Sequence, residues 1–117
     1  MSKDRLIYKI TPTADWEVAQ AAGEFLGASI DLQDGYIHFS SADQVAETAA
    51  KHFAGQSDLL LVAVDAQSLG EALKWEVSRG GALFPHLYGK LSMESVVWSR
   101  AMPIMENGTH DIPLDKA

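Results

Sequence analysis

Three polar side chains alternate with apolar ones in one short segment of the chain, at Tyr36, His38 and Ser40. On a β-strand this alternation places all three on one face, while Ile37 and Phe39 occupy the other. A row of hydrogen-bonding groups is not the pattern of a hydrophobic core, so it predicts a polar face beside a cleft or solvent. The alternative is a structural one, in which His38 is half buried and hydrogen-bonded to a neighbour.

The residues after this segment carry the signature of a helix start. Ser41 is followed three positions later by Gln44, which matches a capping box and predicts a helix over residues 42–53. Free backbone amides at a helix N-terminus attract anions, so we expect an anionic group such as a pyrophosphate near Ala42. In the alternative interpretation, Ser40 and Ser41 only cap the helix.

A tryptophan and a glutamate stand side by side later in the chain, at Trp75 and Glu76. The segment 73–77 has the pattern of a strand, where a carboxylate is costly to bury unless it is paired. If Glu76 lines a cleft, it is a candidate to hold a sugar hydroxyl or to act as a general base. Otherwise it is an exposed residue that pairs with Lys74 or Arg79.

The segment 84–89 places His86 and Tyr88 on one face of an extended stretch, between Pro85 and Gly89. A histidine and a tyrosine on a stiff segment suit the binding of a planar ring or acid–base chemistry. The alternative is a structural histidine that contacts a backbone carbonyl. Because proline has no N–H, the segment is expected only to begin a strand or to lie at a sheet edge.

None of the common local sequence motifs for metal binding, nucleotide binding or hydrolase chemistry stands out. His38 and His86 with Glu76 would make a two-histidine, one-carboxylate set, but their spacing is not a local motif and we expect no metal. The sequence has no GxGxxG, no GxxxxGK[ST], no HExxH and no GxSxG. It also has no cysteine, which excludes disulfides, thiolate metal sites and cysteine nucleophiles.

Composition limits the class of protein. The 117 residues, 47% of them hydrophobic and 21% charged, suit one globular domain over residues 1–117. Nine scattered Lys and Arg against sixteen Asp and Glu give a net charge of −7, so we expect no broad binding to nucleic acids or membranes. The longest apolar run, 59–64, is too short to span a bilayer, and no signal segment precedes it. A cytoplasmic location is expected.

Six strands and two early helices are predicted. The strands fall at residues 5–10, 36–40, 59–64, 73–77, 84–88 and 95–99, and the helices at 14–22 and 42–53. A loop is expected over 27–33, a single helical turn over 68–71, and an irregular tail over 102–117 after a core of about 5–100. Strands that follow one another without long helices indicate an α+β domain with a mostly antiparallel sheet.

Together these segments resemble a small bacterial family, domain of unknown function 952. The resemblance covers residues 6–98. The matching residues are Ile7-Tyr8-Lys9-Ile10, Asp15-Trp16, Gly35-Tyr36-Ile37-His38-Phe39-Ser40 with Gln44, Trp75-Glu76, and Phe84-Pro85-His86-Leu87-Tyr88-Gly89. The last block is the most specific. One departure stands at Lys9, where most members of the family have a histidine.

The resemblance implies a fold grouped with the ADP-ribosyltransferases, with a split, mostly antiparallel sheet that binds NAD or an ADP-ribose-like nucleotide in a cleft. It implies NAD as a co-substrate, with no tightly bound cofactor. Catalytic roles would fall to Glu76, His86 and His38, with Glu76 and His86 competing to stabilise the oxocarbenium-like transition state. Ligand contacts would fall to Lys9, Tyr36, Ser40, Ser41 and Tyr88.

Two classes of function therefore stay open. One is an ADP-ribosyltransferase-like enzyme that acts on a small nucleotide-type ligand. The other is a non-catalytic ligand-binding or protein-interaction module with the same fold, which Lys9 favours because a lysine donates but cannot accept hydrogen bonds. The oligomeric state is not predicted from the sequence.

Overall fold

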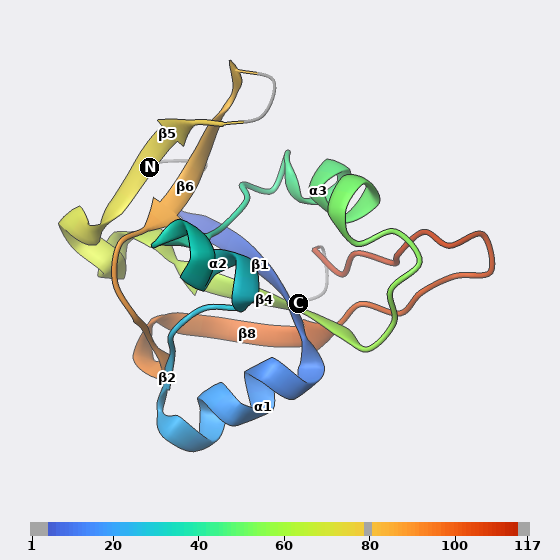
Figure 1. The fold of residues 1–117 in the computed structure, drawn as a ribbon, viewed down its shortest axis with the longest axis horizontal. Coiled ribbons are helices and arrows are strands. Elements are labelled where there is room, and N and C mark those ends of the chain that lie inside the picture. Colours follow the sequence, from blue (N-terminus) through green and yellow to red (C-terminus); the bar gives the residue numbers. More distant parts are fainter. Residues whose placement is uncertain (1–4, 79–80, 115–117) are drawn as a thin grey trace.

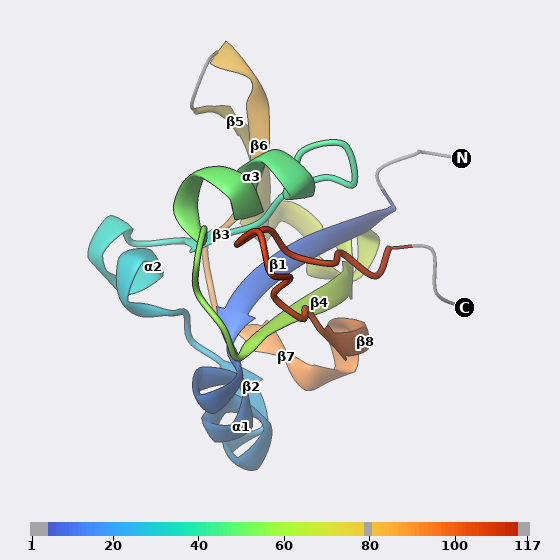
Figure 2. The same ribbon diagram turned by 90° about the vertical axis from the view of Figure 1, so that its right-hand side faces the viewer.

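The computed structural model describes residues 5–78 and 81–114, which form one α+β domain with antiparallel sheets (Figures 1 and 2). Every strand pair is antiparallel, as the sequence predicts. No helix in these parts of the chain is long and apolar enough to cross a membrane.

The central sheet has the order β1-β4-β8, from β1 (Leu6–Pro12), β4 (Leu59–Asp65) and β8 (Val96–Ala101). Both of its faces are covered. Helix α1 (Thr13–Ala22) packs on one face, and α3 (Val45–His52) packs on the other.

Side chains on the two faces of β1 belong to two separate hydrophobic cores. Ile7 joins Trp16 of α1 in one cluster, whereas Tyr8 and Ile10 join Val45 of α3 in the other. Because successive side chains of a strand face opposite ways, one strand can hold both helices in place.

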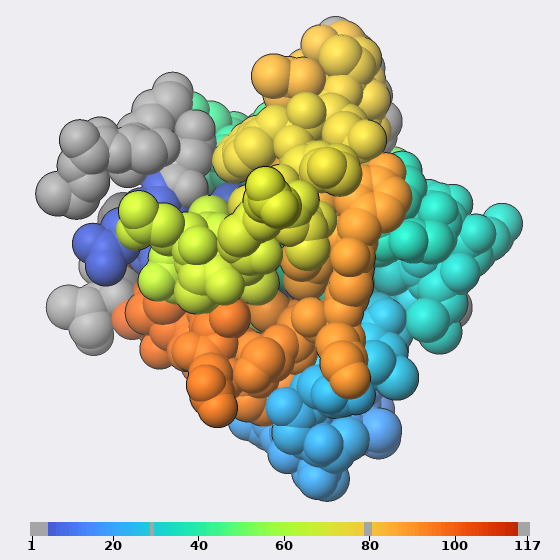
Figure 3. Space-filling view, turned by 90° about the vertical axis from the view of Figure 1, so that its left-hand side faces the viewer, coloured from blue at the N-terminus to red at the C-terminus, as the bar shows by residue number. Residues whose placement is uncertain are grey.

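A second three-stranded sheet carries most of the polar residues singled out above. Its order is β3-β6-β5, from β3 (Ile37–His38), β6 (Leu83–Leu87) and β5 (Leu73–Val77). An isolated bridge between Tyr8 and Ser40 links it to the central sheet. Figure 3 shows the hairpin of β5 and β6 standing out from the body of the molecule.

Short elements complete the fold. Two-residue strands β2 (Glu24–Phe25) and β7 (Leu91–Ser92) pair with each other. The 3-10 helices η1 (Ala66–Ala72) and η3 (Met93–Ser95) precede β5 and β8. The helical turn expected over 68–71 lies within η1, and residues 102–114 contain no helix or strand, as expected for the tail.

Two predictions about helices are wrong. The stretch 27–33, expected as a loop, contains α2 (Ser29–Asp34). This helix is fastened by the Asp31 side chain, which accepts a hydrogen bond from the Ala28 N–H at 2.8 Å. The helix expected from residue 42 begins at Val45, because residues 42–44 form a turn and the Gln44 side chain bonds the Ser41 N–H.

The expected position of Pro85 is also wrong, because β6 is the middle strand of its sheet and Pro85 lies within it. The Pro85 carbonyl accepts the Phe39 N–H at 3.0 Å, so residue 85 turns its hydrogen-bonding side toward β3. Strand β3 ends at His38, so the missing N–H of Pro85 interrupts no regular ladder there.

Candidate functional site

A pocket of about 510 Å³ opens beside β3 and β6, between β1, α2 and α3. Its walls combine aromatic rings with hydrogen-bonding groups. The lining residues are Tyr8, Lys9, Ile10, Ile30, Asp34, Tyr36, His38, Phe39, Ser40, Thr48, His52, Phe53, Ser78, Phe84 and His86. A cavity of this size and mixed lining is of the kind that binds small molecules.

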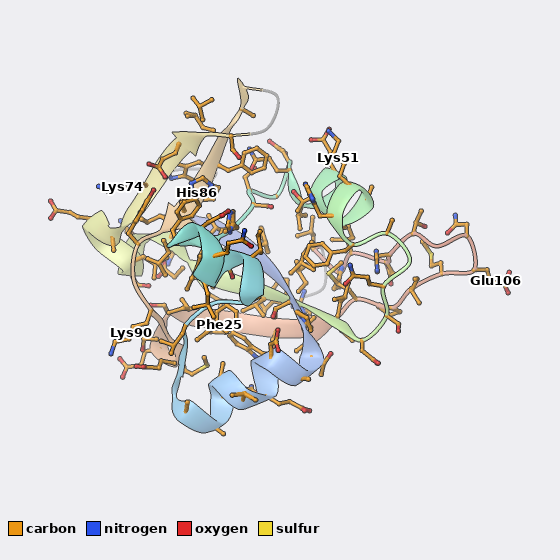
Figure 4. The ribbon with its side chains drawn as sticks, viewed as in Figure 1. Phe25, Lys51, Lys74, His86, Lys90 and Glu106 are labelled. Atoms are coloured by element: carbon orange, nitrogen blue, oxygen red, sulfur yellow. The ribbon has the colours of Figure 1, made fainter. Side chains whose placement is uncertain are left out.

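Strand pairing brings the predicted residues to this pocket. His38 of β3 lies opposite His86 of β6. His86 in turn lies opposite Lys74 of β5 (Figure 4). Side chains in register share a face, so the alternating polar residues of both segments meet on one side of the sheet.

The buried carboxylate of Asp31 is the centre of the polar network. It accepts hydrogen bonds from Lys9 Nζ at 3.0 Å, from the His38 N–H at 3.1 Å and from the Ala28 N–H, and it contacts His38 Nδ1 at 2.6 Å. Burial raises its pKa, but the His38 hydrogen bond and the Lys9 charge outweigh that effect and lower the pKa to about 2. Asp31 is therefore ionised and fully engaged at neutral pH.

Lys9 lines the pocket but is tied to this network. Its side chain is 5% exposed, and Nζ lies 2.8 Å from Oδ2 of Asp31. Burial lowers the pKa of Lys9, while the charge of Asp31 opposes that shift. The ammonium is thus a paired buried charge.

His38 lies between two carboxylates. Its Nδ1 contacts Asp31, and its Nε2 lies 2.9 Å from Oδ2 of Asp34. Both contacts are hydrogen bonds only when both ring nitrogens carry hydrogen. In this geometry both ring nitrogens of His38 face carboxylates, so neither is open to a ligand.

His86 has a different arrangement. Its side chain is buried, and Nδ1 lies 2.9 Å from Oε1 of Glu76, which also accepts the Tyr88 hydroxyl at 2.7 Å. No residue within 5–78 or 81–114 bonds to its Nε2, and His86 lines the pocket. The Glu76 contact therefore favours the tautomer that presents an accepting Nε2 to the pocket.

The shared carboxylate affects the acidity of two groups. Hydrogen bonds from Tyr88 and then from His86 lower the pKa of Glu76. In return, the hydrogen bond to Glu76 raises the pKa of Tyr88 to about 12. Tyr88 is neutral and Glu76 is ionised at neutral pH.

Tyr36 joins these groups through its ring. Its ring stacks on His86 with centroids 4.2 Å apart and an interplanar angle of 28°. It also lies 4.7 Å from the ring of His38 and 5.1 Å from that of Tyr88. Burial raises the pKa of Tyr36, and the charges of Asp34 and Glu76 raise it further.

Not every predicted site residue lines the pocket. Lys9, Tyr36, His38, Ser40 and His86 do. Glu76 and Tyr88 adjoin it through His86, and the alternative Glu76 partner Arg79 lies outside the described residues.

Ser41 is buried away from the lining, and its N–H bonds the side chain of Gln44. The part of α3 that lines the pocket is formed by Thr48 and His52, and not by residues 45–47 at its start. The expectation that a phosphate sits at the start of this helix is therefore not supported by the shape of the pocket.

Sequence reasoning missed Asp31 and Asp34. Asp31 lies in the expected loop 27–33 and Asp34 directly after it, in a turn signal with Gly35, so nothing placed their side chains near the strands. Their three-residue spacing puts them on one side of a helix, but six residues are too few for a periodic signal. No group of three or more potential metal ligands occurs among residues 5–78 and 81–114.

Comparison with known proteins identifies the family. A sequence model described as "Protein of unknown function (DUF952)" matches residues 10–99. The chain belongs to this family. No curated protein matches the sequence.

Solved structures of one bacterial protein are closely similar to this chain. The crystal structure of CC0527 from Caulobacter crescentus is 50% identical with a TM-score of 0.87, covering 91% of this chain and 93% of that one. Its solution NMR structure is 49% identical with a TM-score of 0.84, covering 93% and 94%. These names state no activity, so the function has to be argued from the site.

Proposed function

We propose that the pocket binds NAD or an ADP-ribose-like nucleotide and that the protein transfers ADP-ribose, or a related group, from it. The observation that carries this proposal is the stack of Tyr36 on His86 in the pocket wall. An aromatic wall beside an accepting ring nitrogen suits a planar base that carries hydrogen-bond donors. The resemblance of the family to ADP-ribosyltransferases supports the same ligand class by analogy.

His86 is the group that acts on the acceptor in this proposal. The bond between C1′ of the ribose and nicotinamide breaks, and nicotinamide leaves as a neutral molecule with the bonding electrons. The acceptor oxygen forms the new bond to C1′, and its proton passes to Nε2 of His86. Glu76 acts as a positioning residue, because its contact with Nδ1 keeps Nε2 free to accept that proton.

Negative charge near the pocket serves the transition state. Asp34 lines the pocket and Glu76 adjoins it, so both carboxylates favour positive charge on the ribose ring. The same charges disfavour a phosphate at that end. In this proposal the diphosphate therefore extends away from Glu76, toward the hydroxyl groups of Ser40 and Thr48.

A non-catalytic binding module is the second candidate. The observation in its favour is that Lys9 and both nitrogens of His38 already contact carboxylates. Groups engaged in this way are poorly placed to take part in chemistry. In this case the pocket would hold a nucleotide-type ligand without turning it over.

An NMR titration of isotope-labelled protein with NAD, ADP-ribose and nicotinamide tests binding first. We expect amide shifts at residues 36–40 and 84–88, which His86→Ala abolishes and Lys90→Ala leaves intact. Lys90 contacts Glu24 and is not a pocket residue, so its variant controls for the loss of a side chain.

A nicotinamide-release assay then separates the two candidates. Release that depends on His86 supports the transferase, whereas binding without release supports the module. If none of the three ligands shifts the amides around the pocket, the nucleotide proposal is wrong. Unfolding of His86→Ala, seen by loss of peak dispersion, would require the milder His86→Gln variant in its place.

A further inference from the structure

The charge balance around Tyr36 is one-sided. Among the described residues that line the pocket, Lys9 is the single lysine or arginine, and its ammonium is bound by Asp31. Asp34 lines the pocket and Glu76 lies one hydrogen bond away, through His86. With Lys9 paired to Asp31, a ligand that enters here meets the two carboxylates of Asp34 and Glu76, which outnumber the positive charge of His38 even when both of its ring nitrogens carry hydrogen.

The two aspartates of α2 differ in their exposure and in their polar contacts. Asp31 is 1% exposed, contacts Lys9 and the His38 ring, and accepts hydrogen bonds from two backbone amides. Asp34 is 38% exposed, and its one polar contact within the described residues is with Nε2 of His38. Asp34 is therefore the carboxylate that a ligand can reach.

His86 adds a second acceptor on the same side. Its side chain is 4% exposed, and its Nδ1 contacts Glu76. The neutral ring then presents Nε2 as an acceptor to the pocket. A ligand in the pocket that carries an N–H or O–H group can therefore donate a hydrogen bond to this nitrogen.

The ring of Tyr36 stands between these acceptors. It stacks on His86 and contacts His38, which in turn contacts Asp34. The raised pKa of Tyr36 agrees with this arrangement, since the charges of Asp34 and Glu76 both contribute to it. An electron-rich phenol ring flanked by carboxylates attracts a cation above its face.

We propose that Tyr36, Asp34 and His86 form a subsite that selects a planar, hydrogen-bond-donating group with positive charge and rejects an anionic group of the same shape. The inference rests on the proposed function only in placing a ligand in this pocket. It names the chemistry of the part of the ligand that reaches the subsite, and it makes Asp34 the residue that determines specificity.

Three probes of one shape but different charge test this directly. Benzamidine is cationic, benzamide is neutral and benzoate is anionic. In NMR titrations at pH 8, we expect benzamidine to bind about fivefold more tightly than benzamide, the size of one charge-assisted contact at a half-exposed site. Benzoate should bind more weakly than either, and the shifts should fall on residues 34–38 and 86.

A matched pair of variants assigns the preference to one carboxylate. Asp34→Asn should lower benzamidine affinity about fivefold and benzamide affinity by much less. Asp111→Asn removes the same charge from an exposed position that does not line the pocket, so it should change neither. Peak dispersion checks that both variants fold.

The outcomes separate this inference from the proposed function. Benzoate binding as tightly as benzamidine, an unaffected Asp34→Asn variant, or no pocket shifts with any probe would each overturn the inference. Selective benzamidine binding without any response to NAD or ADP-ribose would sustain the inference while removing the nucleotide proposal. Nucleotide binding with no charge preference among the probes would do the reverse.

Discussion

Replacement of Asp31 by asparagine tests whether one buried carboxylate organises the candidate site. Asparagine has nearly the same volume, so the change removes charge and leaves shape in place. The carboxylate holds Lys9, His38 and the Ala28 amide at once. The amide group of asparagine cannot accept all of these donors, and the ammonium of Lys9 would stay buried without a counter-ion.

The size of the effect follows from two independent arguments. The pKa of Asp31 falls from its ordinary 3.8 to about 2, which corresponds to about 2 kcal/mol in favour of the ionised, folded state. Removing one member of a buried ion pair costs about 3–5 kcal/mol, because the other charge is left uncompensated. We therefore expect Asp31→Asn to lower the free energy of unfolding by about 3 kcal/mol.

Urea unfolding at pH 7 measures this value, and Lys9→Met completes a double-mutant cycle. Lys9→Met alone leaves Asp31 with His38 and its backbone amides, so it should cost less than Asp31→Asn. The double variant should be more stable than the sum predicts, by about 1 kcal/mol or more. A loss below about 1 kcal/mol for Asp31→Asn, or additive effects, would refute the pairing argument.

The same carboxylate shapes the response to acid. Its pKa is lower in the folded state than in the unfolded chain, so the unfolded state takes up the proton first as the pH falls. The stability that Asp31 contributes is present in full above pH 3.8 and is lost as the pH falls toward 2. Asp31→Asn should therefore lose less stability than the wild type over that window, and equal slopes would contradict this.

Two further changes probe local chemistry. Tyr88→Phe removes the main hydrogen bond that lowers the pKa of Glu76, so that pKa should rise toward its ordinary value in a carboxyl NMR titration; an unchanged value would show that the hydroxyl does not matter. Gly35→Ala should cost about 1 kcal/mol in urea unfolding, because residue 35 has a φ of 87° and no neighbour within 4 Å that could offset the strain. Gly89→Ala, at a position outside the left-handed region with equally open surroundings, is the control, and equal losses would refute the conformational explanation.

The parts of the fold with strong local signals were predictable from the sequence. The apolar run at 59–64 became β4, and the alternating residues at 73–77 became β5 with the same bounds. Helix α1 ends where Gly23 adopts a left-handed conformation, as glycine at that position predicts. In each case the local sequence and the tertiary packing favour the same structure.

Helix α2 shows where local signals fail. Six residues give no reliable periodicity, and the helix is held by the Asp31 side chain and not by an apolar stripe. The position of Pro85 inside a sheet failed for a related reason. The missing N–H of Pro85 would break a strand ladder only if the neighbouring strand β3 continued beside it. Where β3 ends depends on how the strands pair, which residues 84–89 alone do not reveal.

The same limit applies to the candidate site: the sequence identifies its residues, but not the partners that each of them contacts. The alternation of polar residues in two segments was sufficient to single out Tyr36, His38 and His86. It could not reveal that His38 is enclosed by two carboxylates while His86 keeps an accepting nitrogen toward the pocket. Asp31 and Asp34 come from α2, which the sequence did not predict, and Glu76 comes from β5, whose pairing with β6 is a property of the folded sheet.

This difference between the two histidines decides how the pocket can work. Nδ1 of each histidine faces a carboxylate, but a second carboxylate, Asp34, occupies Nε2 of His38. A ligand must displace Asp34 before His38 can exchange a proton with it, whereas His86 needs no such rearrangement. Of the two histidines, His86 is therefore the one placed to exchange a proton with a ligand, and the contacts of His38 with Asp34 and Asp31 help to hold those carboxylates in place.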